Sequence, residues 1–65
     1  MKPGEVILNE RKSRGLSQAE LARMSGVCLS TIQNIENGRG CSFDSYDRLC
    51  LSLGLRLVVT KIEYL

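Results

Sequence analysis

The 65-residue chain has no histidine, no tryptophan, one proline and only three aromatic residues. Histidine is the side chain that most often binds metals and transfers protons near neutral pH, so its absence removes the commonest ligand and general base. No two of the three cysteines, Cys28, Cys41 and Cys50, have the two-residue spacing of structural zinc sites. We therefore expect no metal, no cofactor and no enzymatic activity, with reduced cysteines and Cys50 in a small core.

Long apolar runs are also missing. No stretch approaches the roughly 18 apolar residues of a membrane span, and the Met1-Lys2-Pro3 start lacks a signal peptide's apolar core. We expect a cytoplasmic protein. Apolar residues make up 43% of the chain, which favours one folded domain with a small core. The net charge of +2 is only a mild lean toward polyanions.

Capping signals divide the first half of the chain into two helices. Pro3 and Gly4 are expected to form a flexible start, although Pro3 is also suited to the beginning of a helix. Residues 5–13 are expected to form a helix that ends before Gly15. Ser17 followed by Glu20 is a capping box, which predicts a second helix to about Met24. Gly26 then supplies a tight turn.

Two more helices are expected before residue 54. One begins near Cys28 or Leu29 and ends at Asn37–Gly38, and the next is capped by Ser42 or Asp44 and runs to about Leu53. Apolar residues at spacings of three and four predict the buried face of that last helix: Phe43, Tyr46, Leu49, Cys50 and Leu53. The expected fold is all-α, with four helices in residues 1–54.

Residues 55–65 change period from helical to alternating, which predicts a β-strand. A single strand leaves its backbone groups unpaired, so we expect it to pair antiparallel with the same strand of a second copy. The residues expected in this homodimer contact are Leu55, Leu57, Val58, Val59, Thr60 and Ile62.

The two central helices have the chemistry of a DNA-binding unit. Short polar side chains and one leucine lie on the exposed side of the third helix, where they can contact base edges: Leu29, Ser30, Gln33 and Asn34. Phosphate contacts are expected from Gln18, Thr31, Asn37, Arg39 and Arg14. Arg11 and Glu36 are placed to form an ion pair if the first and third helices pack together.

Two other interpretations of these residues stay open at this point. An exposed polar helix face is often merely solvated. Cys41, in a loop beside Arg39, has the position of an activated nucleophile, although it lacks a histidine partner.

The run from Arg14 to Gly40, RGLSQAELARMSGVCLSTIQNIENGRG, resembles the helix-turn-helix of the lambda-repressor/Cro superfamily, also called the XRE family. Its Ser-Gln-x-Glu-Leu-Ala, glycine and Glu-Asn-Gly elements stand at the family's mutual spacings, and a looser likeness covers residues 5–54. The resemblance implies an all-helical domain that binds operator DNA as a dimer. It gives Gln18, Asn37 and Arg39 phosphate contacts, Leu29, Ser30 and Asn34 base contacts, and Arg11 and Glu36 the ion pair.

The chain departs from the family pattern at three places. Cys28 replaces the usual Ser or Thr cap of the third helix, so we expect that helix to fray or to start later, at Ser30. The loop before the fourth helix lacks a common proline. The expected strand stands where a fifth helix is usual, and this resembles short antitoxin-type members of the superfamily.

The sequence therefore predicts a transcriptional regulator, a repressor in the preferred hypothesis, that binds a pseudo-palindromic site in double-stranded DNA as a homodimer. The alternative hypothesis is an antitoxin-type protein that neutralises a partner toxin while regulating its own operon.

Overall fold

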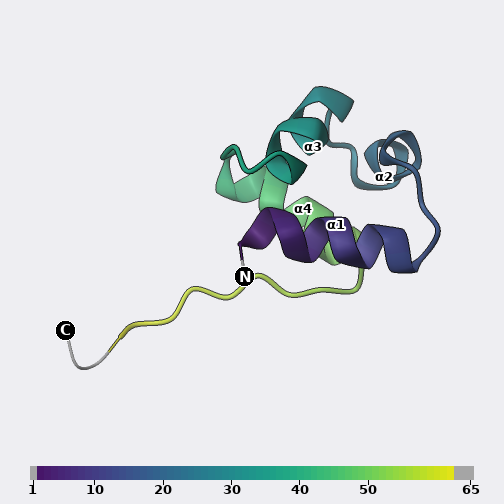
Figure 1. Cartoon of the computed structure of the whole chain (residues 1–65). Helices are drawn as coiled ribbons and strands as arrows, with labels where there is room; N and C mark the ends of the chain where they lie inside the picture. The colour runs from purple at the N-terminus through teal and green to yellow at the C-terminus, as the bar shows by residue number, and fades with distance from the viewer. Residues whose placement is uncertain (1, 63–65) are drawn as a thin grey trace.

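A computed structural model describes residues 2–62 and has four helices: α1 (Pro3–Ser13), α2 (Gln18–Ser25), α3 (Leu29–Glu36) and α4 (Phe43–Ser52). α1 packs against α3 and α4, and α2 packs against the same two helices (Figure 1). The expected four-helix, all-α arrangement is confirmed. Among residues 2–62, no helix is both long enough and apolar enough to cross a membrane.

Each helix contributes to one small apolar core. Side chains spaced three or four apart along α3 and α4 point inward, as expected for helices that bury one face. The core consists of Ile7, Leu21, Val27, Ile32, Ile35, Leu49, Cys50 and Leu53. Because α2 and α3 share this core, the buried face of α3 is held in place by the packing of its apolar side chains.

Local capping determines two of the helix starts. The Ser17 hydroxyl accepts a 3.0 Å hydrogen bond from the Glu20 backbone N–H, and the Glu20 carboxylate accepts one of 3.0 Å from the Ser17 N–H. α2 ends at Gly26, whose φ of 74° is left-handed and therefore suits glycine. Ser42 caps α4 by accepting from the Ser45 N–H. The expected capping box and turn are confirmed.

The start of α1 corrects the sequence prediction. The flexible start expected at Pro3 and Gly4 is wrong, because the helix already begins at Pro3 and Gly4 is buried. The other expectation for Pro3, a place at the beginning of a helix, is confirmed. Proline is favourable at the first helical position because it has no backbone N–H to leave unsatisfied. A Cβ on Gly4 would collide with the carbonyl oxygen of Ile35, so glycine permits the close approach of α1 and α3.

Phe43 is a second correction. The helical spacing predicts it on the buried face of α4, but its side chain is 58% exposed. Phe43 is the first residue of α4, directly after the Ser42 cap. The buried residues of α4 lie further along, at Leu49 and Cys50, so periodicity gave the right face but extended it too far toward the helix start.

The C-terminal segment (residues 55–62) is extended and runs beside α1 toward the N-terminus, then away from the helices (Figure 1). Leu55 and Leu57 pack against the core, and the Leu55 N–H donates to the Cys50 carbonyl oxygen at 2.7 Å. No strand is found in residues 2–62, so the expected strand and its pairing stay predictions. Residues 63–65 of that prediction lie outside the described residues.

Candidate nucleic-acid interface

α3 is amphipathic, with its buried side toward the core and a polar side toward solvent. Ile32 and Ile35 are almost completely buried. Of the expected base-contacting residues, Leu29, Ser30 and Gln33 are exposed and Asn34 is half-buried. These four side chains therefore project from a helix that is held in place on its opposite side.

Asn34 and Arg39 are linked at the C-terminal end of α3. Arg39 Nη1 donates to Asn34 Oδ1 at 3.3 Å, and the Arg39 backbone N–H donates to the Asn34 carbonyl oxygen at 2.8 Å. The side-chain bond uses one lone pair of the Asn34 amide oxygen, so this oxygen can accept a second hydrogen bond while the amide nitrogen donates. The same contact places the Arg39 guanidinium beside the Asn34 side chain on α3.

The expected ion pair between α1 and α3 is present. Arg11 Nε and Nη2 donate to the two Glu36 carboxylate oxygens, each at 2.8 Å, while Arg11 Nη1 donates to the Leu16 carbonyl oxygen at 2.8 Å. Arg11 is 8% exposed overall. The hydrogen bonds that Arg11 donates to the Glu36 carboxylate raise the pKa of Arg11. The pair therefore joins α1, the loop that follows it and the last residue of α3.

Gln18 extends this pair into a network of three side chains. Its Nε2 donates to Glu36 Oε1 at 2.9 Å, on the oxygen that also accepts from Arg11 Nη2. Burial of the Glu36 carboxyl opposes ionisation, but the hydrogen bonds from Arg11 and Gln18 outweigh burial and lower its pKa. The ionised carboxylate accepts hydrogen bonds only, so it fixes the Gln18 amide with its nitrogen toward Glu36.

A comparison with family models matches residues 7–58 to the helix-turn-helix family. The chain belongs to the XRE-type, lambda repressor-like helix-turn-helix family. Comparisons with curated proteins and with solved structures gave no match. The chain is thus a DNA-binding transcription regulator of the XRE type.

α3 begins without a side-chain cap. Cys28 occupies the N-cap position with φ −59° and ψ 142°, but its side chain makes no capping hydrogen bond. The Cys28 carbonyl oxygen still accepts from the Thr31 and Ile32 N–H groups, at 3.0 and 3.1 Å. The helix accordingly starts at Leu29, and the expected shift of its start to Ser30 is wrong.

The remaining phosphate candidates lie in different places. Asn37 is the exposed C-cap of α3, and Thr31 is half-buried within the helix. Arg14 lies at the end of α1, where Nε pairs with Glu10 at 3.0 Å and the guanidinium lies next to Gly54. The fold therefore gathers Gln18, Asn37 and Arg39 around the end of α3, while Arg14 lies beside the end of α4.

The cysteines do not form a reactive or metal-binding cluster in the described part of the chain. Burial raises the pKa of the Cys41 thiol, and burial together with Asp47 raises that of Cys50. A raised pKa keeps a thiol protonated, which argues against the interpretation of Cys41 as an activated nucleophile. Within residues 2–62, no group of three or more histidine, cysteine or acidic side chains is arranged to hold a metal ion.

Sequence reasoning missed the hydrogen bond between Gln18 and Glu36. Each residue was identified separately, one as a phosphate contact and the other as half of an ion pair. Eighteen positions separate them, and no local pattern indicates that their side chains meet. The close approach of Gly4 to Ile35 was also missed, although a proline followed by glycine at a helix start offered a partial signal.

Proposed function

We propose that this protein is a transcriptional repressor that binds a pseudo-palindromic operator as a homodimer. The observation that supports it best is the placement of α3, whose two isoleucines are buried while Leu29, Ser30 and Gln33 are exposed. A helix whose opposite face is packed into a core, and which exposes short polar side chains, fits the major groove of B-DNA.

Base contacts are assigned to four residues of α3. Gln33 and Asn34 each carry an amide that can form two hydrogen bonds with adenine, and the Leu29 side chain suits contact with a thymine methyl group. Ser30 offers a hydroxyl that can donate or accept. Together these residues account for the sequence preference.

Phosphate contacts hold the helix in its register without selecting sequence. Gln18 keeps a second amide N–H beside its bond to Glu36, and it stands at the start of α2. The other proposed contacts are Thr31, Asn37, Arg39 and Arg14. Each charged contact releases counterions from DNA, so affinity is expected to fall steadily as salt rises.

Dimer formation is assigned to segment 55–62, where Leu55, Leu57, Val58, Val59, Thr60 and Ile62 form the contact. Pairing of two such segments would supply partners for their backbone groups and space the two α3 helices for half-sites roughly 34 Å apart. Proline has no N–H, so Val58→Pro is expected to convert a sedimenting dimer into a monomer. An unchanged sedimentation coefficient would refute the pairing.

Selection of binding sites from random duplexes tests the DNA-binding part of the proposal. We expect an enriched two-fold symmetric site that binds at least about a thousandfold more tightly than random duplex, on the scale of specific regulators. Equal affinity for both duplexes would overturn it. A chain that is monomeric alone, and that binds DNA only together with a separate protein, would favour the antitoxin alternative.

A further inference from the structure

The backbone after α3 turns back onto the last turn of the helix. Gly38 has a φ of 86°, in the left-handed region that suits glycine, and its N–H donates to the Ile35 carbonyl oxygen at 3.1 Å. The Arg39 N–H donates to the Asn34 carbonyl oxygen at 2.8 Å. These two bonds form a Schellman motif, a common helix ending. The motif therefore holds the backbone of Arg39 against Asn34.

The side chains of the same two residues are also joined. In a Schellman motif the corresponding pair often makes an apolar contact. Here both side chains are polar, and Arg39 Nη1 donates to Asn34 Oδ1 at 3.3 Å. The guanidinium carries more N–H donors than this bond uses, so it can bind a phosphate at the same time. Arg39 thus touches, through backbone and side chain, a residue to which a base contact is assigned.

The contact with Arg39 favours one orientation of the Asn34 amide. The terminal torsion of asparagine is broad and roughly two-fold, so two orientations that exchange oxygen and nitrogen are similar in energy unless a neighbour favours one. Arginine only donates hydrogen bonds, so the amide oxygen lies toward the guanidinium and the amide nitrogen lies away from it. The oxygen keeps a second lone pair. The amide therefore offers a donor and an acceptor in fixed places, as two hydrogen bonds to adenine require.

We propose that Arg39 is a positioning residue for the Asn34 amide and thereby sets the base preference at the one base pair that Asn34 contacts. This role rests on the proposed function, which assigns a base contact to Asn34 and a phosphate contact to Arg39, and it joins the two. A phosphate bound by Arg39 holds the guanidinium, and the guanidinium holds the amide. A contact with the DNA backbone, which by itself selects no sequence, then sharpens the selection of a base.

Arg39→Ala tests this role when its affinity is measured for every single-base change of the selected site. The pair that Asn34 contacts is the one at which Asn34→Ala loses its preference. At that pair, we expect Arg39→Ala to reduce the preference for adenine by about threefold to tenfold, the range of one net hydrogen bond. The preference at the pair assigned to Gln33 should stay the same. A residue that only binds phosphate weakens all sequences alike, so a uniform loss would overturn the proposal.

The double variant Arg39→Ala, Asn34→Ala distinguishes action through Asn34 from a direct base contact by Arg39. If Arg39 acts through Asn34, its removal from the Asn34→Ala protein lowers the overall affinity but changes no base preference further. A further loss of preference at the same pair would mean that Arg39 contacts the base itself, and would overturn the positioning role.

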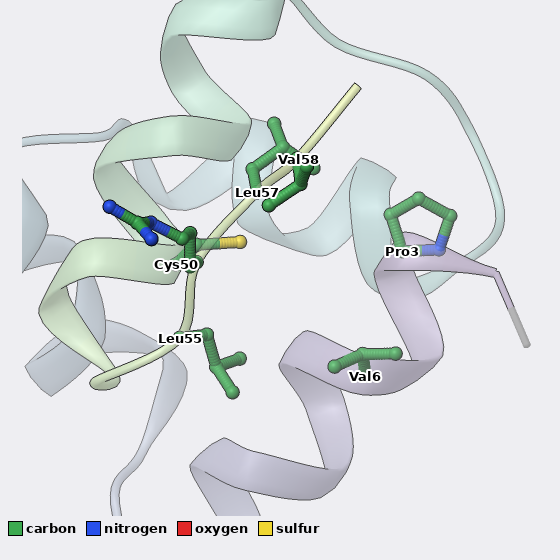
Figure 2. A pocket seen from close by; sticks show the side chains of 7 residues that line it. Pro3, Val6, Cys50, Leu55, Leu57 and Val58 are labelled. Carbon is green, nitrogen blue, oxygen red and sulfur yellow. The ribbon is translucent and has the colours of Figure 1, made fainter. Parts of the chain in front are cut away.

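Arg56→Ala is the matched control for the loss of one arginine charge. Arg56 is exposed and lines an apolar groove of about 330 Å³ that lies between Val6 of α1 and Leu55 of the C-terminal segment (Figure 2). Residues of α1, α4 and that segment line the groove. We expect Arg56→Ala to leave the preference at the Asn34 pair unchanged. An effect there equal to that of Arg39→Ala would indicate a general effect of charge and would overturn the proposal.

A measurement on the free protein tests the contact without DNA. The Arg39 side chain is exposed, so Arg39→Ala should fold as the wild type does. NMR relaxation of the Asn34 side-chain amide should give a lower order parameter in Arg39→Ala than in the wild type, with the Gln33 amide unchanged. Equal order parameters for Asn34 in the two proteins would contradict an amide held by Arg39.

These outcomes separate the role of Arg39 from the proposed function. A wild-type chain that prefers no DNA site overturns both. A chain that selects a site, but in which Arg39→Ala weakens all sites alike, overturns only the role of Arg39.

Discussion

The two ends of α3 are built differently. At its C-terminal end, Glu36 accepts hydrogen bonds from Arg11 and Gln18, and Ile35 lies against the backbone of α1 at Gly4. At its N-terminal end, Cys28 provides no side-chain cap, and Leu29 and Ser30 face solvent. The C-terminal end is held by residues of two helices, α1 and α2, whereas the N-terminal end leaves its side chains exposed.

Within one short helix, the residues that hold the helix in place are therefore different from those whose side chains are exposed. A helix of eight residues has little stability by itself, so its position depends on packing and on the contacts at its ends. The bonded end can fix the direction of the helix while the uncovered end presents groups to a ligand. Changes at the two ends should therefore affect different measurements.

The largest expected effect comes from Glu36→Ala, which removes the hydrogen bonds at the C-terminal end of α3. Arg11 would lose its countercharge while remaining almost buried, and breaking such a pair costs about 3–5 kcal/mol. Urea denaturation should show a loss of this size, and DNA affinity should fall with it. Glu10→Ala, which removes an exposed pair with Arg14, is the matched control and should cost no more than about 1 kcal/mol. Similar losses from the two variants would show that the network does not anchor the helix.

Low pH should weaken the hydrogen bonds that the Glu36 carboxylate accepts at the C-terminal end of α3. The pKa of Glu36 is lower in the folded protein than in the unfolded chain, where glutamate has a pKa of about 4.3. Its stabilising contribution is therefore fully present above that value and is lost as the pH falls through the lower, folded value. An NMR titration of the Glu36 carboxyl should give a midpoint below about 4.3. A midpoint at or above it would mean that Arg11 and Gln18 do not favour the ionised form.

The polar side of α3 is tested by Gln33→Ala combined with Asn34→Ala. Each lost bidentate base contact should remove about 1–3 kcal/mol of discrimination between the selected site and random duplex. Stability in urea should change much less, because Gln33 is exposed and Asn34 is only half-buried. Competition binding with both duplexes measures the effect, and a loss of folding in parallel would show that these residues are structural.

Gly4→Ala tests the close contact between α1 and α3. The added methyl group would meet the Ile35 carbonyl oxygen, so the helices must move apart at a cost of about 1–3 kcal/mol. Gly40→Ala is a suitable control, because nothing lies within 4 Å of its added Cβ. Thermal unfolding should separate the two variants. A Gly4→Ala protein as stable as the Gly40→Ala control would contradict the tight contact.

The smallest effect is expected from adding a cap to the uncovered end with Cys28→Ser. A serine hydroxyl at the N-cap can accept from the Thr31 N–H, as Ser17 accepts from Glu20 in α2, and should stabilise by about 0.5–1 kcal/mol. Cys41→Ser controls for loss of a thiol and should bring no gain. If Cys28→Ser gives no increase in stability, the start of α3 is already satisfied without a cap.

Much of the fold could be predicted because its signals are local. Ser17 and Glu20 are three residues apart, Gly26 follows its helix directly, and the run from Arg14 to Gly38 carries the family pattern without a gap. The prediction of buried residues was wrong where the helical spacing continued to the first residue of a helix. Phe43 continues the spacing of the α4 core, yet at the first position of the helix it is largely uncovered by its neighbours.

The sequence by itself determined the order of the helices, their caps and the family, because each depends on residues close together in the chain. Only the tertiary structure decided that Gln18 donates to Glu36, that Gly4 meets Ile35, and that Leu55 and Leu57 pack on the core beside an open groove. These contacts join residues distant in the sequence. Their geometry depends on how closely whole helices pack, which no short pattern of residues encodes.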